Sequence, residues 1–206
     1  MGFMHLTTSF ADPNWGKQHR RIKTFRAIEE AGWALFHKEG FAETTVEQIA
    51  ARAGISARTF FRYFDSKEAL LFGDWKWQLD ELSRRVQLAP TQTTPLGAIE
   101  GAVLALAEST ERDRHAVQFR SMLATSSTSV KDYYRQVVQP TWEDTIARAL
   151  AGRLDVDVDT DLRPRLVAGM AIAALNAAMT VWVAGDCQRL LPELTSRAFD
   201  LARDPG

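Results

Sequence analysis

The chain has 206 residues, of which 46% are hydrophobic and 25% are charged, values that exclude a predominantly disordered protein and fit one large domain or two small ones. The formal net charge is −1, which by itself argues against nonspecific nucleic-acid binding. The charge is unevenly spread, because residues 17–68 carry ten Lys or Arg against seven Asp or Glu, and the remainder is net acidic.

Residues 1–16 contain Gly, Pro, Asn and Thr without a helical period, and we expect them to form a disordered leader. The next helix is expected from about Arg20 to Lys38, with the small residue Gly32 permitting close packing against the recognition helix. The segment that leads into this helix and its first turns are basic. Two interpretations stay open for this basic stretch: a solvated helix start, or an arm that contacts phosphates or the minor groove; its residues are Lys17, His19, Arg20, Arg21, Lys23 and Arg26.

The stretch from Thr44 to Leu70 predicts two short helices, a tight turn and the start of a third helix. An apolar stripe at helical spacing marks the first helix, formed by Val46, Ile49, Ala50 and Ala53. Thr44 with Glu47 fits a capping box at its start, and Gly54 tolerates the backbone conformation that ends it.

A second helix is predicted from Ala57 to Phe64, with Ser56 as its cap, and Asp65 with Glu68 repeats the start signal for a third. Two helices joined by a Gly-containing turn of this length predict a helix-turn-helix, whose second helix lies in the DNA major groove.

Residues 20–72 resemble the tetracycline-repressor (TetR) family of one-component transcriptional regulators. Matching residue types at matching spacings carry the resemblance: Ile28, Ala31, Leu35, Phe36, Gly40, Phe41, Thr44, Thr45, Val46, Ile49, Ala50, Ala53, Gly54, Ile55, Ser56, Thr59, Phe60, Tyr63, Phe64, Ser66, Lys67 and Glu68. The resemblance implies an all-α protein with an N-terminal three-helix helix-turn-helix domain (residues 17–65) and a helical ligand-binding and dimerisation domain (residues 66–206).

On the predicted recognition helix, Phe60 and Phe64 are four residues apart and should face the protein core. The residues left toward DNA are Ser56, Ala57, Arg58, Thr59, Arg62 and Tyr63. Arg58 is the first candidate for base reading, since its guanidinium can bond guanine O6 and N7 together. Arg62 can read a base or hold a phosphate, and Thr59 can reach a thymine methyl or a base edge.

The resemblance further implies that Thr45, Ser56, Tyr63 and Lys67 bond backbone phosphates. Phe61 departs from the family pattern, because a tyrosine is common there, and its hydroxyl is missing; the ring is then expected on sugar or thymine. Arg52 is either a further phosphate ligand or a favourable charge at a helix C-terminus.

The rest of the chain reads as further helices. One is expected from Ser66 past Trp75 and Trp77 to about Gln87, and the others follow at 96–109, 112–124, 130–153 (bent or interrupted at Pro140), 162–185 and 192–202. The alternation of acidic and apolar residues at 155–161 lacks the glycine and distal Glu of an EF-hand and predicts a solvated loop.

The helix expected at 162–185 is apolar on nearly every face, so it must be buried from several sides. Asn176 and Thr180 interrupt it, and we expect no membrane span and a cytoplasmic protein. The resemblance implies a homodimer through the last two helices; the small-residue run that would allow close approach also fits an internal core helix, and comprises Ala168, Ala171, Ala173, Ala174, Ala177 and Ala178.

By resemblance, an unidentified small-molecule effector, apolar or aromatic, binds the C-terminal domain and releases a repressor from a palindromic DNA operator. The candidate contacts, for each of which core packing is the competing role, are Trp77, Phe119, Met122, Tyr133, Tyr134, Trp142, Asn176, Met179 and Trp182.

Two alternatives stay open: a DNA-binding regulator or activator without a ligand, and an all-helical enzyme. The enzyme is disfavoured, since Cys187 has no evident His partner and His115 stands alone. A single cysteine excludes intrachain disulfides, and four scattered histidines predict no metal site and no cofactor.

Overall fold

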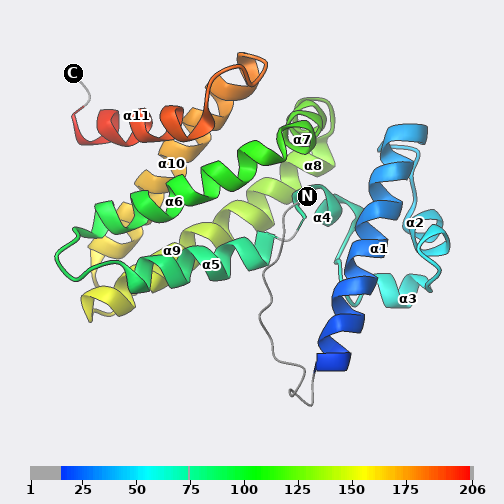
Figure 1. Ribbon diagram of the computed structural model, residues 1–206, viewed down its shortest axis with the longest axis horizontal. Coiled ribbons are helices and arrows are strands. Elements are labelled where there is room, and N and C mark those ends of the chain that lie inside the picture. Colours follow the sequence, from blue (N-terminus) through cyan, green and yellow to red (C-terminus); the bar gives the residue numbers. More distant parts are fainter. Residues whose placement is uncertain (1–14, 74, 205–206) are drawn as a thin grey trace. The chain divides into compact units, whose positions relative to one another are not determined.

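The computed structural model describes residues 15–73 and 75–204, shown in Figure 1. The described residues form helices and turns and contain no strand, so the predicted all-α class is confirmed. They divide at Gly73 into two compact units, which we call the N-terminal unit (residues 15–73) and the C-terminal unit (residues 75–204).

The helices of the N-terminal unit are α1 (Trp15–Glu39), α2 (Val46–Arg52), α3 (Ala57–Phe60) and α4 (Lys67–Phe72). Helix α1 begins inside the segment expected to be disordered, and the other fourteen residues of that segment lie outside the described part of the chain.

Aromatic rings form much of the core of the N-terminal unit. The Phe25 and Phe64 rings stack with their centroids 4.8 Å apart, and the Phe36 and Phe41 rings lie 5.0 Å apart. Phe60 and Phe64 are buried, as the helical spacing predicts. Burial of each such side chain stabilises the fold by about 1.5–3 kcal/mol, which is how a unit with short helices holds α2 and α3 in place.

The prediction of a single helix from Ser66 to Gln87 is wrong, because the helix ends at Gly73 and a separate helix, α5 (Trp75–Leu88), begins after it. The φ of Gly73, 59°, lies in the region that L side chains rarely adopt, and this residue ends α4. Helix α4 belongs to the N-terminal unit, where it packs against α1. The unit boundary therefore lies after α4, whereas the sequence placed it after Asp65.

Gly32 has a different neighbour from the one expected. A Cβ atom at this position would lie 2.6 Å from Cδ1 of Leu70, on α4, so the small residue makes room for α4 and not for the recognition helix. Both residues are buried, and the contact fixes how closely α4 approaches α1.

The helical segments of the C-terminal unit run close to the predicted ranges. They are α5 (Trp75–Leu88), α6 (Pro95–Arg112), α7 (Arg114–Ser126), α8 (Thr128–Tyr133), the π-helical turn η1 (Tyr134–Val138), α9 (Gln139–Leu154), α10 (Leu162–Ala184) and α11 (Leu191–Arg203). In Figure 1, α5, α6 and α9 run side by side, and α11 lies against α10 and α6.

The predicted bend or interruption near Pro140 takes the form of an interruption, because the π-helical turn η1 ends at Val138 and α9 begins at Gln139. Proline has no N–H to donate to the carbonyl of Gln136, four residues earlier, and its ring crowds that carbonyl. The helix accommodates this by widening one turn, and π-turns of this kind are frequent at functional sites.

Helix α10 buries one face against α9, α11 and α6. Its buried residues are Pro164, Ala168, Ala171, Ile172, Ala174, Ala178 and Trp182. By length and composition alone α10 is also apolar enough to cross a membrane, with a mean hydropathy of 1.9, which the interruptions at Asn176 and Thr180 did not lead us to expect. Only 33% of this apolar window is buried within the chain, so the burial from several sides that the sequence predicted is not met by this chain alone.

Candidate DNA-binding surface and effector region

Helix α2 begins one residue later than its sequence signal indicated. Its cap is Thr45, whose hydroxyl accepts a hydrogen bond from Gln48 N at 3.2 Å, while Gln48 Oε1 accepts one from Thr45 N at 2.7 Å. The capping box expected from Thr44 and Glu47 is therefore wrong. Thr44 is instead buried and donates its hydroxyl proton to the carbonyl of Gly40 at 2.8 Å, which closes the connection between α1 and α2.

The turn between α2 and α3 follows the predicted residues. Gly54 has a φ of 69°, and Ile55 N donates to the carbonyl of Ala50 at 2.9 Å, which reverses the chain after α2. Ser56 caps α3 by accepting from Thr59 N at 3.1 Å, and the two hydroxyl oxygens of Ser56 and Thr59 lie 3.0 Å apart. Both hydroxyls therefore belong to the cap that orients α3.

Helix α3 is shorter than predicted. The α-helical part ends at Phe60, and the chain continues to Phe64 as a hydrogen-bonded turn in which Tyr63 N and Phe64 N both donate to the carbonyl of Phe60. The stacking of Phe64 on Phe25 draws this end of the segment into the core, so packing and not helix propensity decides its shape.

The nine predicted DNA contacts fall on the N-terminal unit in two groups. The exposed residues are Thr45, Ser56, Arg58, Phe61 and Arg62; the half-buried ones are Ala57, Thr59, Tyr63 and Lys67.

Two of these side chains are oriented by aromatic neighbours. The Arg62 guanidinium lies over the Tyr63 ring, 5.3 Å from its centroid, and the Phe61 ring meets Phe60 edge to face. Phe61 is 55% exposed, so an apolar ring stands at the surface beside the two arginines.

Lys67 makes contacts that the sequence did not predict. Its ammonium nitrogen lies within 3.1 Å of three backbone carbonyl oxygens in the connection between α1 and α2. The neighbouring Ser66 caps α4 by accepting from Ala69 N at 3.4 Å, so the start signal read at Asp65 is also displaced by one residue.

The basic approach to α1 is exposed where it is described. His19, Arg20, Arg21, Lys23 and Arg26 all lie at the surface, and the side chain of Lys17 falls outside the described residues. An exposed row of cations at one end of a helix is compatible with both interpretations, a solvated start and a phosphate-contacting arm.

The candidate effector contacts separate by burial. Trp142 and Trp182 are almost fully buried, whereas Trp77 and Met122 are 46% and 57% exposed and do not line the interior of the C-terminal unit. The half-buried candidates are Phe119, Tyr133, Tyr134, Asn176 and Met179.

Two of the half-buried candidates contact each other. The Tyr134 hydroxyl, in the π-helical turn, donates to Oδ1 of Asn176 on α10 at 2.7 Å. Burial raises the pKa of Tyr134, while the bond to Asn176 and the nearby charge of Arg120 oppose that rise. The hydroxyl is therefore a neutral hydrogen-bonding group inside a largely apolar helix bundle.

The sequence did not single out Arg120, on α7, as a candidate effector contact. Burial lowers the pKa of its guanidinium, against the electrostatic influence of Tyr134 and Asp113. The available signal was its spacing, since Arg120 follows the buried Val117 by three residues and so continues the inward face of α7.

Trp182 and Cys187 have structural surroundings. The Trp182 indole N–H donates to the carbonyl of Arg189 at 2.9 Å, and both side chains pack in a cluster of buried residues with Leu191 and Leu194. Burial raises the pKa of the Cys187 thiol, which disfavours the nucleophilic thiolate. Within the described residues, no three His, Cys, Asp or Glu side chains gather where they would hold a metal ion.

Two family descriptions match the chain. Residues 28–73 match "Bacterial regulatory proteins, tetR family", and residues 93–205, more than half of the chain, match "MftR C-terminal domain".

Three relatives illustrate the likeness. The mycofactocin biosynthesis transcriptional regulator MftR of Mycobacterium tuberculosis is 29% identical over 184 residues, covering 88% of this chain and 90% of MftR. The HTH-type transcriptional regulator TcmR of Streptomyces glaucescens is 30% identical over 199 residues, covering 92% and 85%. The crystal structure of Thermus thermophilus FadR, a transcriptional repressor in complex with lauroyl-CoA, has a TM-score of 0.60 at 23% identity and covers 87% of this chain and 93% of FadR.

All three relatives are transcriptional regulators and none is an enzyme. Together with the capped helix-turn-helix and the helical C-terminal unit, these matches show that the chain belongs to the TetR family of DNA-binding transcriptional regulators and carries a C-terminal domain of the MftR type.

Proposed function

We propose that this regulator is a homodimeric repressor that binds a palindromic operator and is released from it by a small molecule. The observation that carries the DNA-binding part is the α2–turn–α3 segment, in which a buried Phe60 leaves Arg58 and Arg62 exposed on the opposite side. In the proposed complex Arg58 reads guanine through a bidentate contact, and Arg62 and Thr59 make the neighbouring contacts.

The remaining predicted contacts surround these readers. We propose that Thr45, Ser56 and Tyr63 contact backbone phosphates, and that Ala57 and Phe61 pack on sugar or thymine. The exposure of Phe61 supports this role, since an apolar ring at the surface beside two arginines has no core to fill.

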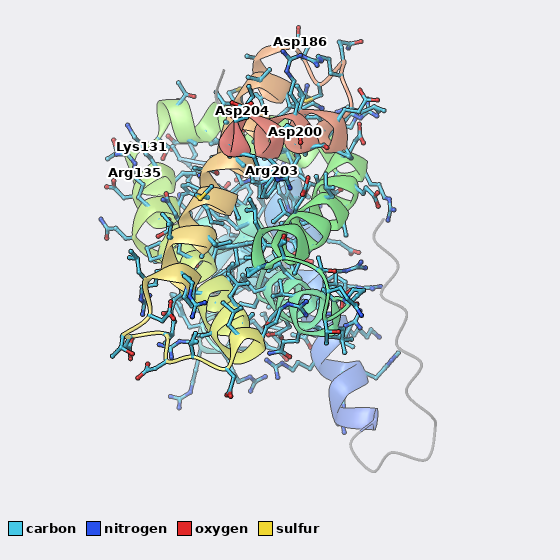
Figure 2. All side chains as sticks on the ribbon, turned by 90° about the vertical axis from the view of Figure 1, so that its left-hand side faces the viewer. Lys131, Arg135, Asp186, Asp200, Arg203 and Asp204 are labelled. Carbon is cyan, nitrogen blue, oxygen red and sulfur yellow. The ribbon has the colours of Figure 1, made fainter. Side chains whose placement is uncertain are left out.

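The dimer is proposed through α10 and α11. Apolar side chains remain exposed there, with Leu166, Val181 and Leu201 each more than half exposed, and the small Ala173 and Ala177 between them. Figure 2 shows Lys131 and Arg135 on one side, Asp200, Arg203 and Asp204 at α11, and Asp186 above them; Arg203 pairs with Asp200 within the chain. Opposite charges on two sides of one face can meet when a second copy binds with twofold symmetry.

The effector is proposed to be a molecule with an apolar or aromatic body and one polar group. Tyr134, Asn176 and Arg120 supply polar atoms within the C-terminal unit, while Phe119, Tyr133 and Met179 supply half-buried apolar surface. Thermus thermophilus FadR, which has a similar fold, is in complex with lauroyl-CoA, and this compound is therefore the first to test. Release requires the effector to prefer the conformation that does not bind DNA.

A gel-shift titration against DNA from upstream of the gene for this chain tests the proposal. We expect a sequence-specific shift that is reversed by an effector which also raises the melting temperature of the protein. Specific binding that no apolar compound reverses would favour the alternative regulator without a ligand, and the lack of any specific shift would refute the repressor assignment for this DNA.

Replacing Arg58 by Ala is expected to relax preference for one base pair in each half-site. The loss is about 1–3 kcal/mol of discrimination, with the dependence of nonspecific binding on salt nearly unchanged. Binding to duplexes mutated at each operator position measures this, and full retention of sequence preference would show that Arg58 is not the base reader.

A further inference from the structure

Lys67 is the first residue of α4, and its side chain reaches back to the connection between α1 and α2. Its Nζ atom donates to the carbonyl oxygens of Phe41 at 2.8 Å, Ala42 at 3.1 Å and Thr44 at 2.8 Å. The same nitrogen lies 4.6 Å from the centroid of the Phe41 ring. A lysine ammonium has three hydrogens to donate, so these three carbonyls use its full hydrogen-bonding capacity.

The ammonium between the three carbonyls stabilises their convergence on one point. Their oxygen atoms carry partial negative charge, and pointing them at one spot is unfavourable unless a positive group offsets the repulsion. The surrounding segment is fixed as well, because Phe41 and Thr44 are buried and the Thr44 hydroxyl bonds to Gly40. The residue that follows, Thr45, caps α2.

We infer that Lys67 is a positioning residue that holds the connection between α1 and α2, and through it the start of α2, and that it does not bind a DNA phosphate. A phosphate oxygen would have to displace one of the three carbonyls, and the freed carbonyl would lose its partner at a half-buried position. The inference rests on the DNA-binding function of the family and replaces the phosphate contact that the resemblance implies at this position.

The salt dependence of binding separates the two roles. Each phosphate neutralised by a cation contributes about 0.9 to the slope of log K against log salt concentration. For the Lys67→Met variant we expect the dissociation constant for a fluorescein-labelled duplex, taken from upstream of the gene, to rise about tenfold with the slope unchanged. The control is Lys76→Met, which removes an exposed lysine on α5, outside the N-terminal unit, and should leave both quantities unchanged.

Hydrogen exchange in the absence of DNA provides a second measurement. We expect Lys67→Met to increase amide exchange at Thr45 and Gln48, whose N–H groups form the capping box of α2, and Lys76→Met to leave it unaltered. A residue that only binds phosphate would not affect the free protein.

Lys67→Arg keeps the charge and tests the geometry. The guanidinium spreads its donors over three nitrogen atoms in one plane, so it cannot replace a single nitrogen on which three carbonyls converge. We therefore expect faster amide exchange than in the wild type, weaker DNA binding and an unchanged salt slope. The inference is overturned if this variant matches the wild type in binding and exchange, or if Lys67→Met lowers the slope by about 0.9 with unchanged exchange. A wild-type protein that does not bind this duplex would refute the proposed operator location, and the exchange measurement would still decide the role of Lys67.

Discussion

At the scale of single residues, side chains of the N-terminal unit often serve its own backbone. Thr44, Thr45, Ser56 and Lys67 each bond to backbone groups, although three of the four match family positions that contact phosphates. An atom that orients a helix end also fixes where that helix presents its other side chains. The binding surface is therefore prepared by hydrogen bonds within the protein before any DNA is bound.

Gly32 offers a stability prediction at this scale. Replacing it by Ala places a Cβ atom 2.6 Å from Leu70 Cδ1, and the cost of overpacking, about 1–3 kcal/mol, exceeds the gain in helix propensity of up to about 1 kcal/mol. We expect a net loss of about 1 kcal/mol in the free energy of unfolding, measured by urea denaturation.

The control for Gly32→Ala is Gly101→Ala. Gly101 lies within α6, and nothing approaches its would-be Cβ within 4 Å, so this variant should be more stable than the wild type. In a Leu70→Ala background the Gly32→Ala change should cease to destabilise, because the clashing group is gone. Destabilisation that persists there would mean that Leu70 is not the cause.

At the scale of elements, helix ends and interruptions follow from specific groups. Gly73 ends α4, the π-helical turn precedes Pro140, and Asp161 caps α10 by accepting from Arg163 N at 2.9 Å. The Arg163 side chain also donates to the Asp161 carboxylate. This hydrogen bond is the main reason that the pKa of Asp161 is lowered from the ordinary 3.8 to about 2. The start of α10 is therefore sensitive to acid.

The Asp161→Asn variant should melt at a lower temperature than the wild type at pH 7, since it keeps a capping oxygen and loses the charge. A carboxyl group whose pKa is lowered by folding stabilises the protein above its unfolded pKa and loses this contribution as the pH falls through the folded pKa. The difference in melting temperature should therefore shrink between about pH 3.8 and pH 2.

Because the partner of Asp161, Arg163, is exposed and Asp161 itself is half-buried, the same difference should also be smaller in concentrated salt. A difference in melting temperature that stays constant from pH 7 to pH 2 would contradict the role of the carboxylate charge.

At the scale of the whole molecule, the proposed dimer depends on the exposed apolar face of α10. Replacing Val181 by Glu puts a charge on that face, and we expect monomers by light scattering. A monomer cannot bind two half-sites together, so operator affinity should fall about 100-fold or more.

Leu88→Glu is the matched control, because Leu88 is equally apolar and 68% exposed but lies at the end of α5. This variant should stay dimeric and bind the operator as the wild type does. A dimeric Val181→Glu protein would place the interface elsewhere.

The sequence by itself determined the family, the all-α class and the order of most helices. Apolar spacing and the residues Gly54 and Ser56 act over a few positions, so their consequences are readable without a structure. The exposure of Arg58 and the burial of Phe60 also follow from spacing along one short helix.

Only the tertiary structure decided the rest, because the deciding partners lie far away in sequence. The carbonyls bound by Lys67 are 23 to 26 residues from it in sequence. Leu70 on α4 contacts Gly32 on α1, and Asn176 on α10 accepts a hydrogen bond from Tyr134 in the π-helical turn. Local patterns cannot encode which of several candidate polar groups a side chain reaches once the chain has packed. The same limit explains why both helix-start signals were placed one residue too early. Thr44 and Thr45 are equally good caps for α2 by sequence, as are Asp65 and Ser66 for α4, and at α2 the burial of Thr44 leaves Thr45 as the cap.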